Sequence, residues 1–168
     1  MIQRLLAGAH YLLGFQGAGS LQNIHPLLIH FPIAFLIGSV LLYVLSWIAR
    51  KESWAWIGLW LLTLGTISAA AAVWTGLAAS ASVMIAPSVR QHILIYHRAV
   101  MLVVFALSIA LSLWALAARP MPQRGRGAFL ALLLVMAALI TAGTDFGAWM
   151  VYGYNAGGSL PQPIEFSQ

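Results

Sequence analysis

The stretch that decides the fold is "WAWIGLWLLTLGTISAAAAVWTGL", residues 54–77, which contains no charged residue. A helix of about 20 apolar residues crosses the hydrocarbon core of a bilayer, which is about 30 Å thick. Three further apolar stretches of spanning length lie on either side of it, at about residues 26–49, 99–118 and 127–152. The sequence therefore predicts an all-α polytopic membrane protein, a bundle of four transmembrane helices.

The chain divides into three expected parts. Residues 1–22 are expected to form a short amphipathic interfacial helix and a linker, because residues 2–15 have apolar side chains at helical spacing but are too short and too polar to span. Residues 23–154 are expected to form the four-helix transmembrane domain. Residues 155–168, rich in Gly and Pro, are expected to form an irregular C-terminal tail.

The composition limits the class of protein. Hydrophobic residues make up 62% of the chain and charged residues 7%, whereas about a quarter of residues are charged in soluble domains. The absence of cysteine excludes disulfides and thiolate chemistry. We expect no nucleic-acid partner, because the basic residues are scattered singly rather than along a stripe. Since no hydrolase triad, P-loop or dinucleotide motif is present, we favour an electron-transfer or accessory subunit over a stand-alone catalyst.

The basic residues predict the orientation in the membrane. Five share the side that is reached after the first and third spans: Arg50, Lys51, Arg119, Arg124 and Arg126. Three lie on the opposite side: Arg4, Arg90 and Arg98. Because Lys and Arg accumulate in cytoplasmic loops, we expect both termini in the periplasm of a bacterial inner membrane.

All five histidines fall on the side opposite the five basic residues: His10, His25, His30, His92 and His97. His30 lies about one turn into the first span, and His97 just ahead of the charge-free part of the third. Because these spans run in the same direction, the two rings are expected at similar depth. Helix bundles bind cofactors through side chains of facing helices, and His is a common axial haem ligand. We therefore expect His30 and His97 to hold the iron of a b-type haem.

Other side chains are candidates for the same cofactor site. They are two further imidazoles, an arginine for the haem propionates and a thioether as a weaker axial ligand: His25, His92, Arg98 or Arg90, and Met101. A zinc or copper ion is an alternative, but histidines five residues apart are about 140° apart on a helix, so two helices would have to contribute. In the structural alternative, the histidines hydrogen-bond only to backbone or lipid headgroups.

Asp145 is the one acidic residue inside a predicted span, and it shares a helix face with Thr141, Trp149 and Tyr152. A carboxylate inside a membrane is costly and is usually paired. Four interpretations stay open. Together with Tyr152, it supports the cofactor site by orienting a histidine N–H; it relays protons; it pairs with Arg98; or it lies shallow enough to reach water.

Small and aromatic residues bear on the packing. Two sets of small residues predict close helix contact, with space for a flat cofactor as the alternative: Gly65, Ala69, Ala72 and Gly76, and the pair Gly143 and Gly147. Aromatic residues near the helix ends predict an interfacial belt, with a quinone pocket as the alternative. Pro32 either kinks the first span or marks the start of its regular helix.

Three blocks of sequence carry a family resemblance: "IHPLLIHFPIAFLIGSVLLYVLSW" at residues 24–47, "RQHILIYHRAV" at 90–100 and "GAWMVYGYNAGG" at 147–158. The chain resembles a family of bacterial four-helix membrane proteins called domain of unknown function 2231. The resemblance implies a compact bundle with histidines gathered at one face and an association with haem or quinone. It also implies that Tyr154 stands where members commonly have a histidine, which puts more weight on His30 and His97.

Two functions from different classes follow from this sequence. The first is a small membrane redox component that passes electrons between a quinol and an outer acceptor such as a periplasmic cytochrome. The alternative is a non-catalytic structural or pigment-binding subunit of a larger respiratory or photosynthetic complex. A metal carrier is a third possibility.

Overall fold

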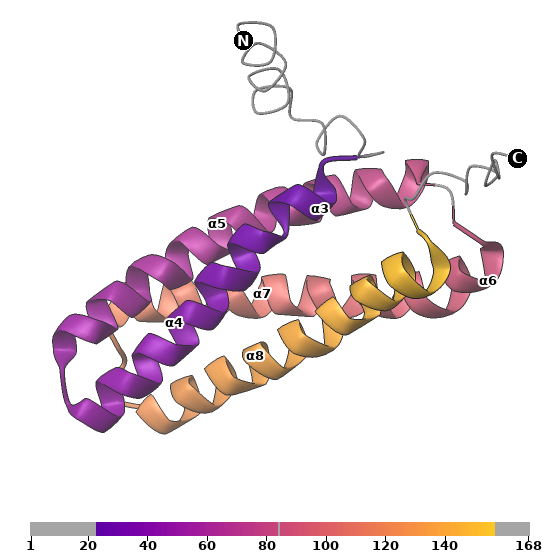
Figure 1. Ribbon diagram of the computed structural model, residues 1–168. Coiled ribbons are helices and arrows are strands. Elements are labelled where there is room, and N and C mark those ends of the chain that lie inside the picture. Colours follow the sequence, from indigo (N-terminus) through magenta and orange to yellow (C-terminus); the bar gives the residue numbers. More distant parts are fainter. Residues whose placement is uncertain (1–22, 84, 157–168) are drawn as a thin grey trace, which may run out of the picture.

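The computed structural model describes residues 23–83 and 85–156, which form a bundle of long helices (Figure 1). Four helical segments are long and apolar enough to cross a membrane: His25–Ala49, Glu52–Ser82, Pro87–Ala118 and Arg126–Gly153. Within the described residues there is no strand. The prediction of an all-α membrane protein with four spans is therefore confirmed.

Short helical pieces accompany three of the four long helices. The first span contains α3 (His25–Leu28) and α4 (His30–Ala49), and the second is α5 (Glu52–Ser82). The third joins α6 (Pro87–Val89), the π-helix η1 (Arg90–Leu94) and α7 (Ile95–Ala118). The fourth joins α8 (Arg126–Ala148) to the π-helix η2 (Trp149–Gly153). Because the spans alternate in direction, all the short pieces lie at the same end of the bundle (Figure 1).

Two expected features lie outside the described residues. One is the amphipathic helix within residues 1–22, with His10 and Arg4. The other is the part of the expected tail from residue 157 onward.

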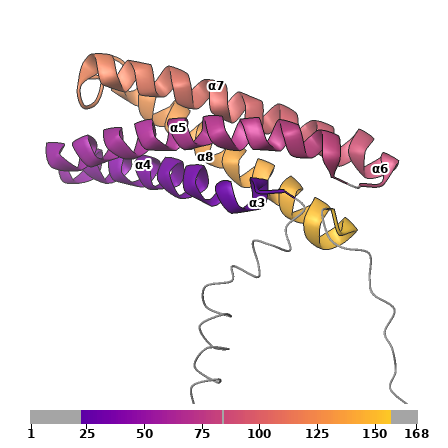
Figure 2. The ribbon, with the colours of Figure 1, turned by 90° about the horizontal axis from the view of Figure 1, so that it is seen from above.

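The four long helices occupy the corners of a square. Helix α4 packs along α5, α5 along α7, α7 along α8, and α8 along α4. Helices α4 and α7 therefore lie on one diagonal and α5 and α8 on the other, as the two views in Figures 1 and 2 show. A side chain that points inward from α4 or α3 consequently approaches one that points inward from α7.

A cluster of aromatic residues fixes one end of this square. Tyr43 on α4 is fully buried, and its hydroxyl donates a hydrogen bond to the Pro120 carbonyl, 2.9 Å away, in the α7–α8 connection. The Phe129 ring packs edge-on against Tyr43 and Trp114, with centroids 5.0 and 5.6 Å apart. The cluster joins the first span to the last two, and the phenol is satisfied, as an apolar environment requires.

Close approach between α4 and α5 depends on a glycine of the predicted small-residue stripe. A Cβ atom at Gly65 would lie 2.7 Å from Leu36 Cδ2 on α4, so a larger residue does not fit. Buried hydroxyls join the next pair of helices, since Thr66 Oγ1 on α5 lies 2.8 Å from Ser112 Oγ on α7. Small residues and interhelical hydrogen bonds are the usual means of helix association in membranes.

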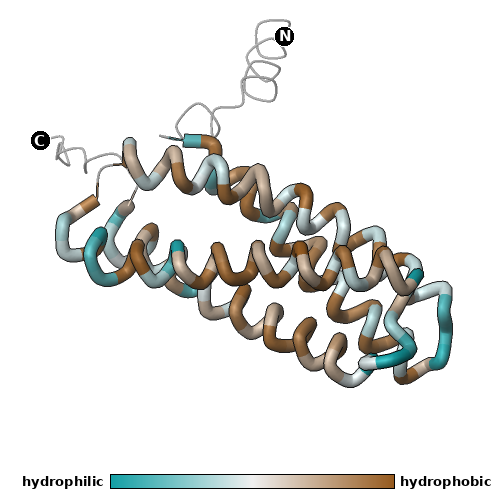
Figure 3. The backbone as a smooth tube through the Cα atoms, turned by 180° about the vertical axis from the view of Figure 1, so that it is seen from behind, coloured by the Kyte–Doolittle hydropathy of each residue, from teal (hydrophilic) through white to brown (hydrophobic). Residues whose placement is uncertain are grey.

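The outer surface of the bundle is apolar along its length. Figure 3 shows hydrophobic residues covering the middle of the helices and hydrophilic residues gathered at the two ends. Large side chains that face outward include Ile67, Leu113 and Val135. In a bilayer, lipid hydrocarbon covers this surface, so these apolar side chains are not exposed to water.

Candidate functional site

The two ends of the bundle carry different chemistry. The end formed by the start of the first and third spans carries His25, His30, His92 and His97 and is called here the histidine end. The opposite end, with the α4–α5 and α7–α8 connections, is called the basic end and carries Arg50, Lys51, Arg119, Arg124 and Arg126.

His97 on α7 points into the bundle toward α8. Its Nδ1 lies 2.8 Å from the Gly143 carbonyl. Because a carbonyl only accepts, we assign the ring proton to Nδ1, which leaves the lone pair of the neutral ring on Nε2. A Cβ atom at Gly147 would lie 3.3 Å from His97 Cε1. The predicted Gly143 and Gly147 pair therefore provides a seat for the His97 ring.

His25 on α3 is held against α5 in the same manner. Its Nδ1 lies 3.2 Å from Thr75 Oγ1, and the Thr75 hydroxyl donates its one proton to the Ala71 carbonyl at 3.0 Å. With the hydroxyl proton on this carbonyl, the Thr75 oxygen accepts from His25, and on this basis we assign the ring proton to Nδ1. A Cβ atom at Gly76 would lie 2.9 Å from His25 Cε1. Gly76 is the seat of this second ring.

The two held rings belong to opposite corners of the bundle and lie at the same end of it. Both are half-buried. No hydrogen bond of either Nε2 atom is seen among the described residues, and the His25 ring also interacts with the Ala72 carbonyl on α5. A hydrogen bond from Nδ1–H that leaves Nε2 free is the arrangement that orients metal-ligating histidines.

His30 takes a different position from the one expected of it. It is exposed on α4, with its Nδ1 3.4 Å from the Leu27 carbonyl. At the end of the bundle where His97 lies, the structure therefore turns His25, rather than His30, toward another helix. Two causes act together: residues five apart lie on different faces of a helix, and Pro32, which cannot donate to the Leu28 carbonyl, separates α3 from α4.

Pro32 lies in the first turn of α4, so it marks the start of the regular helix, which was one of the two expected roles.

His92 on η1 is exposed. It lies five residues before His97, on another face of the helix, just as the exposed His30 lies five residues after His25. The sequence analysis did not identify Thr75, and it named Gly76 only as a small residue for helix packing. The glycine at the end of the α5 stripe was the signal that a side chain from another span lies against it.

The other candidate residues are spread around this end. Met101 packs on Gly143, where an added Cβ would collide with the Met101 methyl group, so its thioether lies against α8. Arg98 is exposed. Arg90 donates to the Ser80 and Val83 carbonyls at 2.5 and 3.2 Å, which caps the C-terminal end of α5.

Asp145 and Tyr152 both face outward. Tyr152 is 89% exposed. Asp145 is exposed and makes no hydrogen bond or ion pair with any of the residues in the described ranges, so the expected pairing with Arg98 is not seen. The position of Asp145 is close to the end of α8, which agrees with the interpretation of a shallow site.

The number of ligand side chains at the histidine end distinguishes between a zinc ion and a haem iron. In the part of the chain that the structure describes, no three His, Cys, Asp or Glu side chains are grouped as metal ligands. A zinc ion takes three or four ligands from the protein. Haem iron needs only two axial ligands, because the macrocycle supplies four nitrogens. Two imidazoles therefore match the number of axial ligands that a haem iron takes, and they are too few for a zinc site.

The comparisons with known proteins give one match. A family model described as "Predicted membrane protein (DUF2231)" matches residues 21–159, a range that includes all four spans. No curated protein and no solved structure matches the chain. The histidine end and both glycine seats lie within the matched range.

Proposed function

The chain belongs to the DUF2231 family of predicted membrane proteins, and from this premise we propose that it is a small integral membrane redox component. It binds b-type haem through His25 and His97 and takes part in electron transfer. One observation carries the proposal. Two imidazoles from opposite corners of the bundle each use Nδ1 for a hydrogen bond to a neighbouring helix and keep Nε2 free.

The residues around the pair have distinct tasks in this proposal. The Gly143 carbonyl and the Thr75 hydroxyl orient the rings and raise the basicity of Nε2. The glycines of both seats let the rings enter the bundle. Haem supplies reversible one-electron chemistry when it is bound. In this proposal the protein acts as an electron carrier.

The membrane setting follows from the charges of the two ends. The basic end faces the cytoplasm of a bacterial inner membrane, and the histidine end faces the periplasm, with both termini on that side. A quinol in the bilayer and a periplasmic cytochrome are the electron donor and acceptor that this placement favours. Arg98, exposed one residue after His97, is available to pair with haem propionates.

An absorption spectrum of the detergent-solubilised full chain tests the proposal. We expect a Soret band that weakens and shifts in His25→Ala and in His97→Ala, because each variant removes one axial ligand of the iron. His30→Ala and His92→Ala are matched controls, since they remove exposed imidazoles at the same end. A band that survives His25→Ala but is lost in His30→Ala contradicts the assigned pair. A preparation without a Soret band after growth with added haem contradicts the haem proposal.

Asp145 favours a second candidate function, a non-catalytic subunit of a larger respiratory or photosynthetic complex. An exposed carboxylate in a membrane span is costly unless it reaches water or a partner, and a neighbouring subunit with a basic residue would supply one. Co-purification with a large complex that Asp145→Asn disrupts, in a colourless protein, supports this alternative. Purification as an isolated coloured protein contradicts it.

A further inference from the structure

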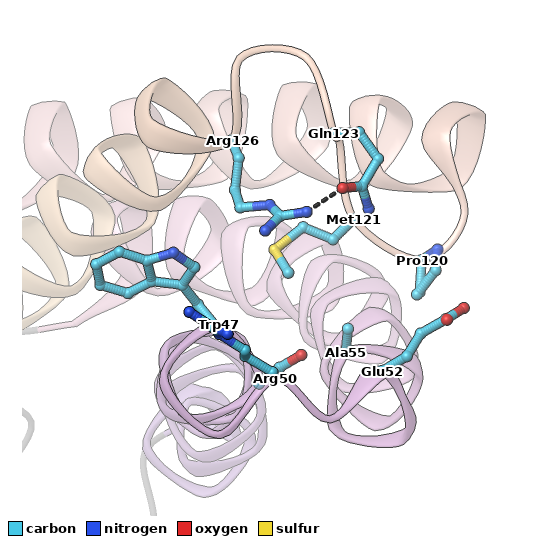
Figure 4. A pocket seen from close by; sticks show the side chains of 9 residues that line it. Trp47, Arg50, Glu52, Ala55, Pro120, Met121, Gln123 and Arg126 are labelled. Atoms are coloured by element: carbon cyan, nitrogen blue, oxygen red, sulfur yellow. Dashed lines mark hydrogen bonds between the residues drawn. The ribbon is translucent and has the colours of Figure 1, made fainter.

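The basic end contains a cavity of about 450 Å³ that has no part in the haem proposal. It opens between the α4–α5 and α7–α8 connections, and two arginines, Arg50 and Arg126, are among the residues that line it. Figure 4 shows Arg126 extending toward the cavity from the α7–α8 side and Arg50 lying on the α4 side, next to Trp47. Two cations from different connections therefore share one space.

Arg126 is held in this space with a donor unused. One terminal nitrogen donates to Gln123 Oε1, which fixes the guanidinium toward the cavity. Its Nε is buried and has no hydrogen-bond partner among the described residues. A buried charged donor without an acceptor is unfavourable. An anion in the cavity would accept a charge-assisted hydrogen bond from the terminal nitrogens of this guanidinium and compensate its charge.

The lining as a whole is cationic and amphipathic. Glu52 is the one carboxylate in it, and Figure 4 shows this carboxylate directed away from the Arg126 guanidinium. Trp47 and Met121 add apolar surface beside the charges. Such a lining suits a ligand that combines a negative group with hydrocarbon.

The position in the membrane identifies the source of that ligand. Trp47 is 54% exposed and Ile48 is 66% exposed in the last turn of α4, so the rim of the cavity continues into the lipid-facing surface. Tryptophan is enriched at the headgroup level. Five of the eight Lys and Arg residues lie at this end, and juxtamembrane basic clusters attract anionic lipids.

We propose that this cavity binds the phosphate group of an anionic phospholipid, between Arg50 and Arg126. The phosphate accepts from the Arg126 guanidinium, and the acyl chains lie along the exposed apolar surface at the end of α4. Glu52 limits the affinity by repulsion, so the lipid exchanges with the bilayer.

Native mass spectrometry of the detergent-solubilised full chain tests this proposal with phosphatidylglycerol and phosphatidylcholine as probes at equal concentration. We expect phosphatidylglycerol to bind about tenfold more tightly, because a zwitterionic headgroup brings its own cation. Arg126→Gln lowers phosphatidylglycerol binding about tenfold. Arg124→Gln is the matched control: it removes the same charge from the same connection, but its side chain is exposed and does not line the cavity.

Glu52→Gln distinguishes a lost site from a misfolded protein, because it is expected to raise phosphatidylglycerol binding about twofold to fivefold. If Arg124→Gln weakens phosphatidylglycerol binding as much as Arg126→Gln does, the proposal is overturned, because the lipid is then attracted by the surface charge in general. Equal binding of the two lipids overturns it as well. Inorganic phosphate that displaces phosphatidylglycerol from the wild-type chain at similar concentration overturns the lipid source and assigns the cavity to a soluble phosphate.

Discussion

The two ends of the bundle hold their polar side chains by different means. At the histidine end, each inward ring bonds to a helix far away in the sequence, His25 to Thr75 and His97 to Gly143. At the basic end, Arg126 bonds to Gln123, three residues before it, and keeps its Nε unsatisfied. In our proposals, the first arrangement orients two imidazoles for a cofactor, and the second leaves an arginine donor for a lipid phosphate.

The largest expected effect comes from filling a glycine seat. Gly143→Val places a branched side chain where Met101 and Val100 already lie. We expect about 1–3 kcal/mol of destabilisation from overpacking, together with loss of the Soret band, because α8 moves away from His97. Thermal unfolding in detergent and the absorption spectrum measure the two effects.

Gly127→Ala is the matched control on the same helix, since a Cβ atom there meets nothing within 4 Å. It is expected to leave the spectrum unchanged. If it lowers the melting temperature as much as Gly143→Val, the effect at Gly143 comes from glycine loss in general, and the seat has no special role.

A smaller effect is expected from removing the acceptor of His25. Thr75→Val keeps the volume of the side chain but leaves His25 Nδ1–H without its partner. Haem affinity should fall about tenfold to a hundredfold, as for other groups that orient a ligand, measured by haem titration. Thr141→Val is the control, because Thr141 is exposed and bonds only to its own helix. Equal losses in both variants would show that the Thr75 bond does not orient the ring.

The smallest expected effect is at the basic end. Tyr43→Phe removes the bond to the Pro120 carbonyl and should cost about 1–2 kcal/mol of stability, without any change in the Soret band. Tyr96→Phe, an exposed tyrosine at the histidine end, should change stability by less than about 0.5 kcal/mol. Thermal unfolding of both variants decides the point, and a Soret change in Tyr43→Phe would show that the two ends are coupled.

The four spans were predictable because length and hydropathy are properties of a continuous stretch of sequence. The expectation that His97 lies at the same end as the other histidines rested on its depth in the membrane. That depth can be counted in residues from the boundary of the span. It was harder to predict which histidine of the first span turns inward, because depth does not tell which face of the helix a side chain occupies. Pro32 and the break at Ile29 turn His25 inward and leave His30 exposed.

The basic-end cavity had no signal in the sequence. Its lining comes from residues 46–55 and 120–126, which meet only after the bundle has formed. The small residues were identified, but their neighbours were not. Gly65 accommodates a leucine, as expected of close packing, while Gly76, Gly143 and Gly147 accommodate two imidazoles and a thioether. The small residues in the sequence show where another helix can approach closely. Only the pairing of the helices shows which side chain packs there.

The hydrogen bond from Tyr43 to Pro120 has a consequence for biogenesis. Its donor belongs to the first helical hairpin and its acceptor to the start of the second, 77 residues later. A newly inserted first hairpin therefore holds a phenol with no acceptor in the lipid until translation has delivered the rest of the chain. The bond can form only when both hairpins have been inserted, so it stabilises the complete bundle and not the first hairpin alone.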